Sequence, residues 1–401
     1  MQDTHSARVT IEGRIFARSN DELLVGDAFA RSAVALAGPA VGAHVFEGDL
    51  VRASCERRED GSLVAHEIER VFDGRARAFD ARSEARRFVH EGHAARLVAR
   101  QAVLARVRAF FSGRGFVEVE TPSIARCPGL DLHLTAFSAV DTATDSLLGF
   151  LVTSPEYHLK RVLVGGIPRC FQLAKCFRSG ESGTRHEPEF TMLEWYRAWG
   201  SLEDLLVDTE SLVRAACDAD HVARRDGGQV ALSGPFERWT VREAFARWAP
   251  EVSDPIALAE RDEHEYFRWL GERIEPELGR DRPAFLTHFA ARHASLSKLD
   301  PSDPTVCLRA ELYIDGMELS NGFVELTDPH EQRRRFERDV LDRRERGLPA
   351  YPIDEDFLGA LEEGMPPSVG NAMGLDRLVA VALGTRDLRD VVAFSHRPRH
   401  A

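Results

Sequence analysis

The residue types best suited to chemistry lie on two predicted strands that a short charged loop connects. In the first strand, residues 170–178, Arg178 shares a face with small and polar side chains. In the second strand, the period of two places Phe190, Glu194 and Tyr196 on one face. A planar base could stack on the phenyl ring, an ammonium could bind between the carboxylate and the phenol, and the guanidinium could bind a phosphate. The alternative is an ordinary hairpin with a solvated charged loop.

Two further carboxylates flank a predicted turn at Asp315-Gly316, a dipeptide typical of two-residue hairpins. With this turn, residue 311 faces residue 320, and Glu311 and Glu318 lie diagonally on one face. Two carboxylates beside a triphosphate suit Mg²⁺, which takes few protein ligands together with phosphate oxygens. The alternative is a pair of solvated carboxylates, which is common in an acidic chain.

Several segments together resemble the lysyl branch of the class II aminoacyl-tRNA synthetases. Residues 177–196, FRSGESGTRHEPEFTMLEWY, resemble motif 2, and their ending is similar to the elongation factor P lysyltransferases, the beta-lysine ligases. A helix followed by GFVEVETP at 115–122 resembles motif 1, and GNAMGLDRL at 370–378 resembles motif 3. TSPE at 153–156 and ELYIDGMELSNGFVEL at 311–326 resemble the substrate and metal segments of the family. The resemblance covers roughly residues 93–396.

This resemblance implies ATP-dependent activation of lysine or beta-lysine as an aminoacyl-adenylate, followed by transfer to a lysine side chain of elongation factor P. It implies that Arg178 holds the carboxylate and the α-phosphate, that Arg377 holds the γ-phosphate, and that Mg²⁺ binds Glu311 and Glu318. The further ATP contacts that it implies are Glu181, His186 and Phe190. The substrate contacts that it implies are Glu156, Glu194, Tyr196, Asn321, Phe323, Glu325 and Ala372.

Three positions either differ from the family pattern or distinguish between its branches. Motif 2 usually has Glu two residues after its Arg, where this chain has Gly180, so the neighbouring Glu181 is the candidate for the adenine contact. Glu325 lies an odd number of residues from Glu318, which strict alternation would turn to the other face, and a bulge at Gly322 would restore its direction. Ala372 matches the lysyltransferase branch, whereas ordinary lysyl-tRNA synthetases have Gly there, and this favours beta-lysine.

These segments need a scaffold that joins strands from both halves of the chain. The resemblance implies an α+β fold in which helices flank a mostly antiparallel sheet of six or seven strands. Apolar spacing separately predicts a helix from His93 to Ser112. The catalytic domain is expected to span residues 93–401, with a polar, partly helical insertion at about 218–282. Because motif 1 forms the dimer interface in the family, we expect a homodimer.

Residues 1–75 alternate short β-like runs with turns and predict a small OB-like barrel, followed by a linker at 76–92. The barrel range holds 13 Asp and Glu residues against 9 arginines and no lysine. Barrels that bind nucleic acid need a basic groove with stacking aromatic residues, and core packing explains the phenylalanines at 16, 29, 46 and 72 more simply. We therefore expect no productive tRNA binding.

The composition is that of a globular protein with reduced cysteines. The 401 residues carry a formal net charge of −13, which opposes broad attraction to polyanions. The six cysteines show no metal-binding spacing. The sequence lacks an apolar run of eighteen residues and a basic-then-apolar leader, so we expect a cytoplasmic protein with no membrane partner.

Two other functions compete with the lysyltransferase interpretation. A short lysyl-tRNA synthetase would share the motifs, but the reduced and acidic N-terminal domain argues against it. A regulatory protein that has lost catalysis would not need both motif arginines and both metal carboxylates.

Overall fold

The computed structural model describes residues 7–75 and 77–396. The outer ends of the predicted domain ranges, at 1–6 and 397–401, and the first linker residue, 76, lie outside the described residues. The chain divides into two compact units, residues 1–99 and residues 100–401. The boundaries predicted at 75 and 92 stay predictions. Within the described ranges, no helix combines the length and the apolar character needed to cross a membrane.

The N-terminal unit is built on a closed five-stranded barrel with the strand order β1-β2-β3-β5-β4, as the OB-like prediction requires. Alternate positions such as Leu23 and Val25 fill its interior. The prediction that core packing explains the phenylalanines is wrong for Phe29, Phe46 and Phe72, which are 75%, 39% and 61% exposed. The strands are β1 (Ala7–Arg18), β2 (Glu22–Gly26), β3 (Arg31–Leu36), β4 (Leu50–Arg57) and β5 (Leu63–Phe72).

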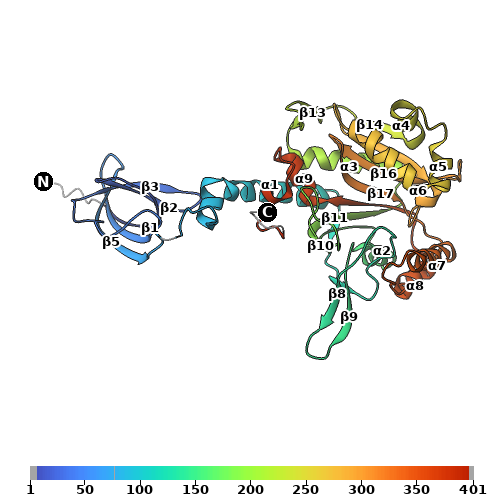
Figure 1. Ribbon diagram of the computed structural model, residues 1–401, viewed down its shortest axis with the longest axis horizontal. Helices are drawn as coiled ribbons and strands as arrows, with labels where there is room; N and C mark the ends of the chain where they lie inside the picture. The colour runs from blue at the N-terminus through green and yellow to red at the C-terminus, as the bar shows by residue number, and fades with distance from the viewer. Residues whose placement is uncertain (1–6, 76, 397–401) are drawn as a thin grey trace. The chain divides into compact units, whose positions relative to one another are not determined.

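The second unit is organised on one eight-stranded sheet, which confirms the predicted α+β class (Figure 1). All its pairings are antiparallel except the two at the edges, where β14 pairs with β15 and β6 with β10. These short edge strands raise the number from the predicted six or seven to eight. In sheet order the strands are β14 (Glu237–Thr240), β15 (Ala284–Ala290), β16 (Val306–Ile314), β17 (Met317–Val324), β18 (Ser368–Gly374), β11 (Glu189–Ala198), β10 (Arg169–Phe177) and β6 (Val117–Glu118).

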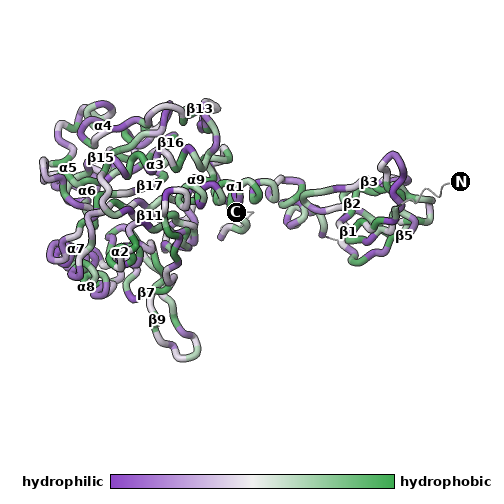
Figure 2. The backbone as a smooth tube through the Cα atoms, turned by 180° about the vertical axis from the view of Figure 1, so that it is seen from behind, coloured by the Kyte–Doolittle hydropathy of each residue, from purple (hydrophilic) through white to green (hydrophobic). Residues whose placement is uncertain are grey.

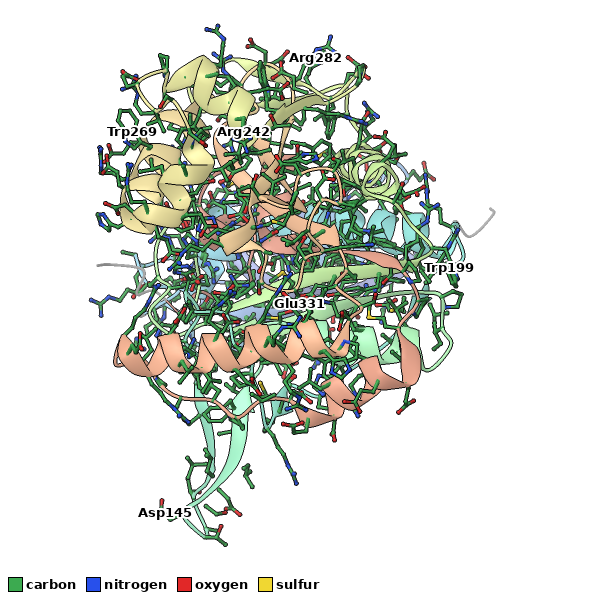
Figure 3. All side chains as sticks on the ribbon, turned by 90° about the vertical axis from the view of Figure 1, so that its right-hand side faces the viewer. Asp145, Trp199, Arg242, Trp269, Arg282 and Glu331 are labelled. Carbon is green, nitrogen blue, oxygen red and sulfur yellow. The ribbon has the colours of Figure 1, made fainter. Side chains whose placement is uncertain are left out.

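Helices cover both faces of this sheet. One face packs its largest side chains, including Trp195, against α1 (His93–Ser112), α3 (Leu202–Cys217) and α9 (Leu375–Ala382). The bounds of α1 agree with the predicted helix. The other face, which includes Tyr196, packs against α2 (Glu156–Val164), α7 (Pro329–Glu345) and α8 (Glu355–Gly364). Helix α7 is strongly hydrophilic, as Figure 2 shows, and Glu331 lies near its beginning (Figure 3).

A small three-stranded sheet carries a hairpin that projects from the unit, with Asp145 at its tip (Figure 3). Its strands are β7 (Ile124–Ala125), β8 (Ser138–Asp141) and β9 (Ser146–Leu151). The range 218–282, predicted to be an insertion, contains helices that share an apolar cluster with β15 and β16. It contains β12 (His221–Ala223), β13 (Gln229–Ala231), α4 (Val241–Trp248), α5 (Pro255–Arg261) and α6 (Glu263–Trp269). Single turns of π- or 3₁₀-helix occur at Arg86–His90, Leu270–Ile274, Glu275–Glu277, Ala291–His293 and Leu388–Asp390.

Candidate active site

Strand register places several predicted site residues in one row across the sheet. Glu194 on β11 lies opposite Ala372 on β18, which in turn lies opposite Asn321 on β17. Asn321 is paired with Glu311 on β16. Because paired residues of neighbouring strands point to the same face, these four side chains form a continuous surface. It faces the side of the sheet that α2, α7 and α8 cover.

A second row lies two residues along each strand and therefore on the same face. Tyr196 on β11 is opposite Gly370 on β18, and Gly370 is opposite Phe323 on β17. Phe323 is paired with Arg309 on β16. Only glycine fits at position 370, because an added Cβ would lie closer than van der Waals contact to the Tyr196 ring and to the Glu325 carboxylate.

The register of the β16–β17 hairpin corrects one detail of the prediction. Tyr313 faces Glu318 as predicted, but Glu311 faces Asn321 and not residue 320. The register shifts by one residue because Leu319 is an additional residue on β17, which makes a bulge. The bulge is at Leu319, not at Gly322. It brings Asn321 and Phe323 to the same cavity as Glu318, which strict alternation would not do.

A cavity of about 720 Å³ lies over the two rows. Its lining includes every predicted site residue except Glu325. The lining includes both the carboxylates of Glu156 and Glu194 and the guanidinium groups of Arg178 and Arg377. Such a cavity suits a ligand that carries both ammonium groups and anionic groups. The predicted residues in its lining are Glu156, Arg178, Glu181, His186, Phe190, Glu194, Tyr196, Glu311, Glu318, Asn321, Phe323, Ala372 and Arg377.

Glu194 is a fully buried carboxylate with two hydroxyl donors. Ser154 Oγ donates to its Oε1 at 2.5 Å, and the Tyr196 hydroxyl donates to its Oε2 at 3.2 Å. Burial, together with the negative charge of Glu156, raises the pKa of Glu194 to about 8. No cation of the described residues forms an ion pair with it, so an ammonium of a ligand would find an oriented and uncompensated partner.

Glu325 has a different environment from the one predicted. It is buried beside the cavity and not in its lining, and its Oε2 lies 2.6 Å from the ammonium of Lys160. The same ammonium donates to Glu156 Oε1 at 2.6 Å. Lys160 is therefore a site residue that the sequence did not suggest, because a Glu and a Lys four residues apart are ordinary on a solvated helix. A direct contact between Glu325 and a substrate stays a prediction.

Arg178 begins the connection between β10 and β11, and its guanidinium lies 5.1 Å from the centre of the Phe190 ring. Its Nε is buried without a partner among the described residues, so it can donate a hydrogen bond to a ligand. Gly180 has a φ of 84°, which favours glycine, and this turn explains why Glu is absent there. The next residue, Glu181, lines the cavity with its carboxylate 3.9 Å from Arg178.

Arg377 at the start of α9 is held by backbone and ring acceptors. Its Nη1 donates to the carbonyl oxygen of Glu318 at 2.9 Å, and its Nη2 lies 2.7 Å from Nε2 of His186. Burial and the nearby charge of Arg377 lower the pKa of His186, so the imidazole is neutral and accepts this hydrogen bond. Two separate segments of the chain thereby orient one guanidinium toward the cavity.

The predicted metal carboxylates belong to an acidic group at the end of the β16–β17 hairpin. Glu311 is buried, accepts from Arg309 Nη2 at 2.5 Å and accepts from the Tyr313 hydroxyl at 2.7 Å. Burial raises its pKa to about 7, with Arg309 opposing and Glu318 adding to the shift. Such an excess of negative charge fits a divalent cation that also binds phosphate oxygens. Among the described residues there is no group of three or more Asp, Glu, His and Cys side chains that could hold a metal without such a ligand.

The buried carboxylate of Glu194 gives a first prediction, which concerns stability. Its pKa is raised above the ordinary value of 4.5, so its contribution to stability is complete below that value and is lost as the pH rises through about 8. The unfolding temperature of the ligand-free protein should therefore fall less between pH 5 and pH 8.5 in Glu194→Gln than in the wild type. Glu189→Gln, an exposed position on the same strand, is the control and should keep the wild-type slope. Equal slopes in all three proteins would contradict the assignment.

Comparison with known proteins agrees with this geometry. Residues 77–398 match the family model for class II tRNA synthetases (D, K and N). The chain is 42% identical over 310 residues to elongation factor P–(R)-beta-lysine ligase from Yersinia enterocolitica, an alignment that covers 75% of this chain and 94% of that protein. It is 42% identical over 311 residues to the protein of that name from Photorhabdus laumondii, and 41% identical over 309 residues to the one from Pectobacterium carotovorum. Each of these two alignments covers 75% of this chain and 95% of the relative.

Proposed function

Because the chain belongs to the class II tRNA synthetases (D, K and N) and, within them, to the elongation factor P–(R)-beta-lysine ligases, we propose that it joins lysine or beta-lysine to elongation factor P. The chain is a ligase of the class II synthetase type, which uses ATP. The observation that supports this substrate best is the cavity itself, in which buried carboxylates and the predicted arginines Arg178 and Arg377 line one space. The test is transfer of the labelled amino acid to elongation factor P in the presence of ATP.

In the proposed first step, the carboxylate of the amino acid attacks the α-phosphate of ATP, and pyrophosphate leaves. A carboxylate is already a nucleophile, so this step needs no general base. The protein contributes orientation and charge neutralisation. Arg178 binds the reacting carboxylate and the α-phosphate, Arg377 binds the γ-phosphate, and Phe190 stacks on adenine.

The amino end of the substrate is bound by the acidic part of the cavity. Glu194 and Tyr196 bind the distal ammonium, and Glu156 binds the other amine. Asn321 and Phe323 complete the pocket wall in the adjoining strand. In the second step the ε-amine of the acceptor lysine attacks the acyl carbon, and AMP leaves.

The acidic group on the hairpin is the proposed place for Mg²⁺. Glu311 and Glu318 would hold it, and when bound it would supply positive charge to the phosphate chain. Arg309 and the Tyr313 hydroxyl keep the Glu311 carboxylate oriented in the absence of metal.

Ala372 gives a second prediction, which concerns the choice of isomer. Its position in the row lies between Glu194 and Asn321, so its methyl group borders the space for the amino end of the substrate. One methyl group in a tight site discriminates by about 1–3 kcal/mol, which is enough to favour one position of an amine over another. The wild type should prefer beta-lysine, and Ala372→Gly should raise activity with α-lysine relative to beta-lysine. Pyrophosphate exchange rates with both isomers measure this ratio. An unchanged ratio in the variant would refute the role of Ala372, and a wild type that prefers α-lysine would refute the assignment of beta-lysine.

We also propose that the protein acts as a homodimer in the cytoplasm, where its acceptor functions in translation. Apolar side chains of the projecting hairpin and of β6 are exposed, with Val117 at 46%, Leu147 at 58% and Leu148 at 57%. Exposed apolar side chains of this kind can belong to an association surface. Light scattering should give about twice the mass of the 44.8 kDa chain. Replacing Leu147 and Leu148 together by serine should shift the protein toward the monomer, and a monomeric wild type would refute the proposal.

A further inference from the structure

A cation that belongs to the protein is buried beside the cavity. The side chain of Lys160 is fully buried, with its ammonium 2.6 Å from Glu156 Oε1 and 2.6 Å from Glu325 Oε2. The ammonium also lies 5.2 Å from the centre of the Phe323 ring. The other two lysines of the chain, Lys175 and Lys298, are exposed. Burying an ammonium costs desolvation free energy unless it is paired with negative charge. A buried ammonium beside a ligand cavity is therefore a candidate for a functional role.

The charges around Lys160 form one coupled group. Burial opposes the charge on Lys160, but Glu156 and Glu325 outweigh it and raise its pKa, so the side chain is protonated. Glu194 is the third carboxylate of this group. The charge of Glu156 contributes to the raised pKa of Glu194. The charges of Glu156 and Glu194, together with burial, raise the pKa of Glu325. One cation therefore faces three carboxylates. When these are ionised, two negative charges are left without a partner.

We propose that Lys160 is a positioning residue that sets the number of ammonium groups the site accepts. It neutralises the carboxylate that lies behind the cavity wall, Glu325, and holds one oxygen of Glu156. The unmatched charge then belongs to Glu156 and Glu194, which both line the cavity. A substrate with two ammonium groups balances this charge, and one with a single ammonium group leaves a carboxylate buried and unpaired. This inference rests on the proposed function, because it explains how the same site selects a diamino acid.

The count of charges around Lys160 predicts how substitutions change the selectivity for diamino acids. Lys160→Met keeps the length of the side chain but leaves one carboxylate too many. Glu325→Gln keeps the shape but leaves one too few, although Glu325 does not line the cavity. Glu325→Gln should therefore lower the affinity ratio of lysine or beta-lysine over 2-aminohexanoic acid, which lacks the distal amine, by at least about tenfold. Lys160→Met should keep or raise this ratio, because the additional unmatched negative charge favours a second ammonium group. The double variant Lys160→Met with Glu325→Gln restores the balance and should recover most of that ratio.

Calorimetric titration of the wild type and the variants with the three amino acids measures these ratios, and pyrophosphate exchange measures the proposed activity separately. Lys175→Met is the matched control, because Lys175 also faces a glutamate, Glu189 at 3.2 Å, but at the exposed surface. It should bind as the wild type does. If Lys160→Met does not fold, Glu325→Gln and the double variant still test the proposal, since the second should bind the diamino acids more selectively than the first.

A double variant that keeps the low ratio of Glu325→Gln, or a wild-type ratio in Glu325→Gln, would overturn the proposal. Normal exchange together with either of these results would overturn this inference alone. Selective binding with full recovery in the double variant, but without exchange in the wild type, would overturn the proposed function alone. A wild type that binds no diamino acid would overturn both.

Discussion

Replacing Arg178 or Arg377 by alanine should reduce amino-acid-dependent ATP–pyrophosphate exchange by at least about a hundredfold. Both guanidinium groups line the cavity, and both are oriented before any ligand binds: Arg178 lies over the Phe190 ring, and Arg377 is held by His186 and the Glu318 carbonyl oxygen. Groups that are already oriented stabilise the charge of the displacement step without reorganisation.

The matched control is Arg334→Ala, which removes an exposed arginine of α7 whose ion pair is with Glu331 on its own helix. It should leave the exchange rate unchanged. Arg178→Lys should not restore activity, because a compact ammonium lacks the planar fork that binds two oxygens at once. Near-normal exchange in both alanine variants would refute the assignment of the site.

An alanine at position 370 should disable the site without changing any charge. A methyl group added to Gly370 would lie closer than van der Waals contact to the Tyr196 ring and to the Glu325 carboxylate, and both of these side chains are buried. Overpacking of this kind costs about 1–3 kcal/mol of stability. The displacement of Tyr196 should also lower the catalytic efficiency of exchange at least tenfold, since Tyr196 holds Glu194.

The control is Gly359→Ala on α8, where an added methyl group meets no atom within 4 Å. Alanine favours a helix over glycine, so this variant should be as stable as the wild type or slightly more stable. Thermal unfolding and exchange kinetics of the two variants give the comparison. Equal behaviour of Gly370→Ala and Gly359→Ala would show that the space at Gly370 is not needed.

Period-two alternation and turn-forming residues are sufficient to predict the central strands from the sequence. The shared face of Phe190, Glu194 and Tyr196 and the Asp315-Gly316 turn follow from local rules, and the structure has both. The bulge at Leu319 does not follow from such rules, because an additional residue on one strand depends on how the neighbouring strands pair. The residue predicted to lie opposite Glu311, residue 320, therefore differs by one position from the observed Asn321.

The role of Lys160 in the site could not be predicted from the sequence. Its spacing from Glu156 is that of a solvated helical pair, and only the packing of α2 against the sheet and α8 buries it beside Glu325. On a solvated helix this ion pair would contribute little, but burial makes it a strong interaction that fixes a positive charge beside the cavity. Local pattern likewise favours Phe29, Phe46 and Phe72 as core residues, but all three are exposed in the N-terminal unit.

The most direct test of the proposed function supplies purified protein with ATP and radiolabelled lysine or beta-lysine, together with either elongation factor P or total tRNA. The cavity geometry and the family membership predict label on the factor, abolished by Arg178→Ala, and none on tRNA. Label on tRNA and not on the factor would contradict the proposal and would favour a short lysyl-tRNA synthetase. Absence of label on both would favour a protein that has lost catalysis.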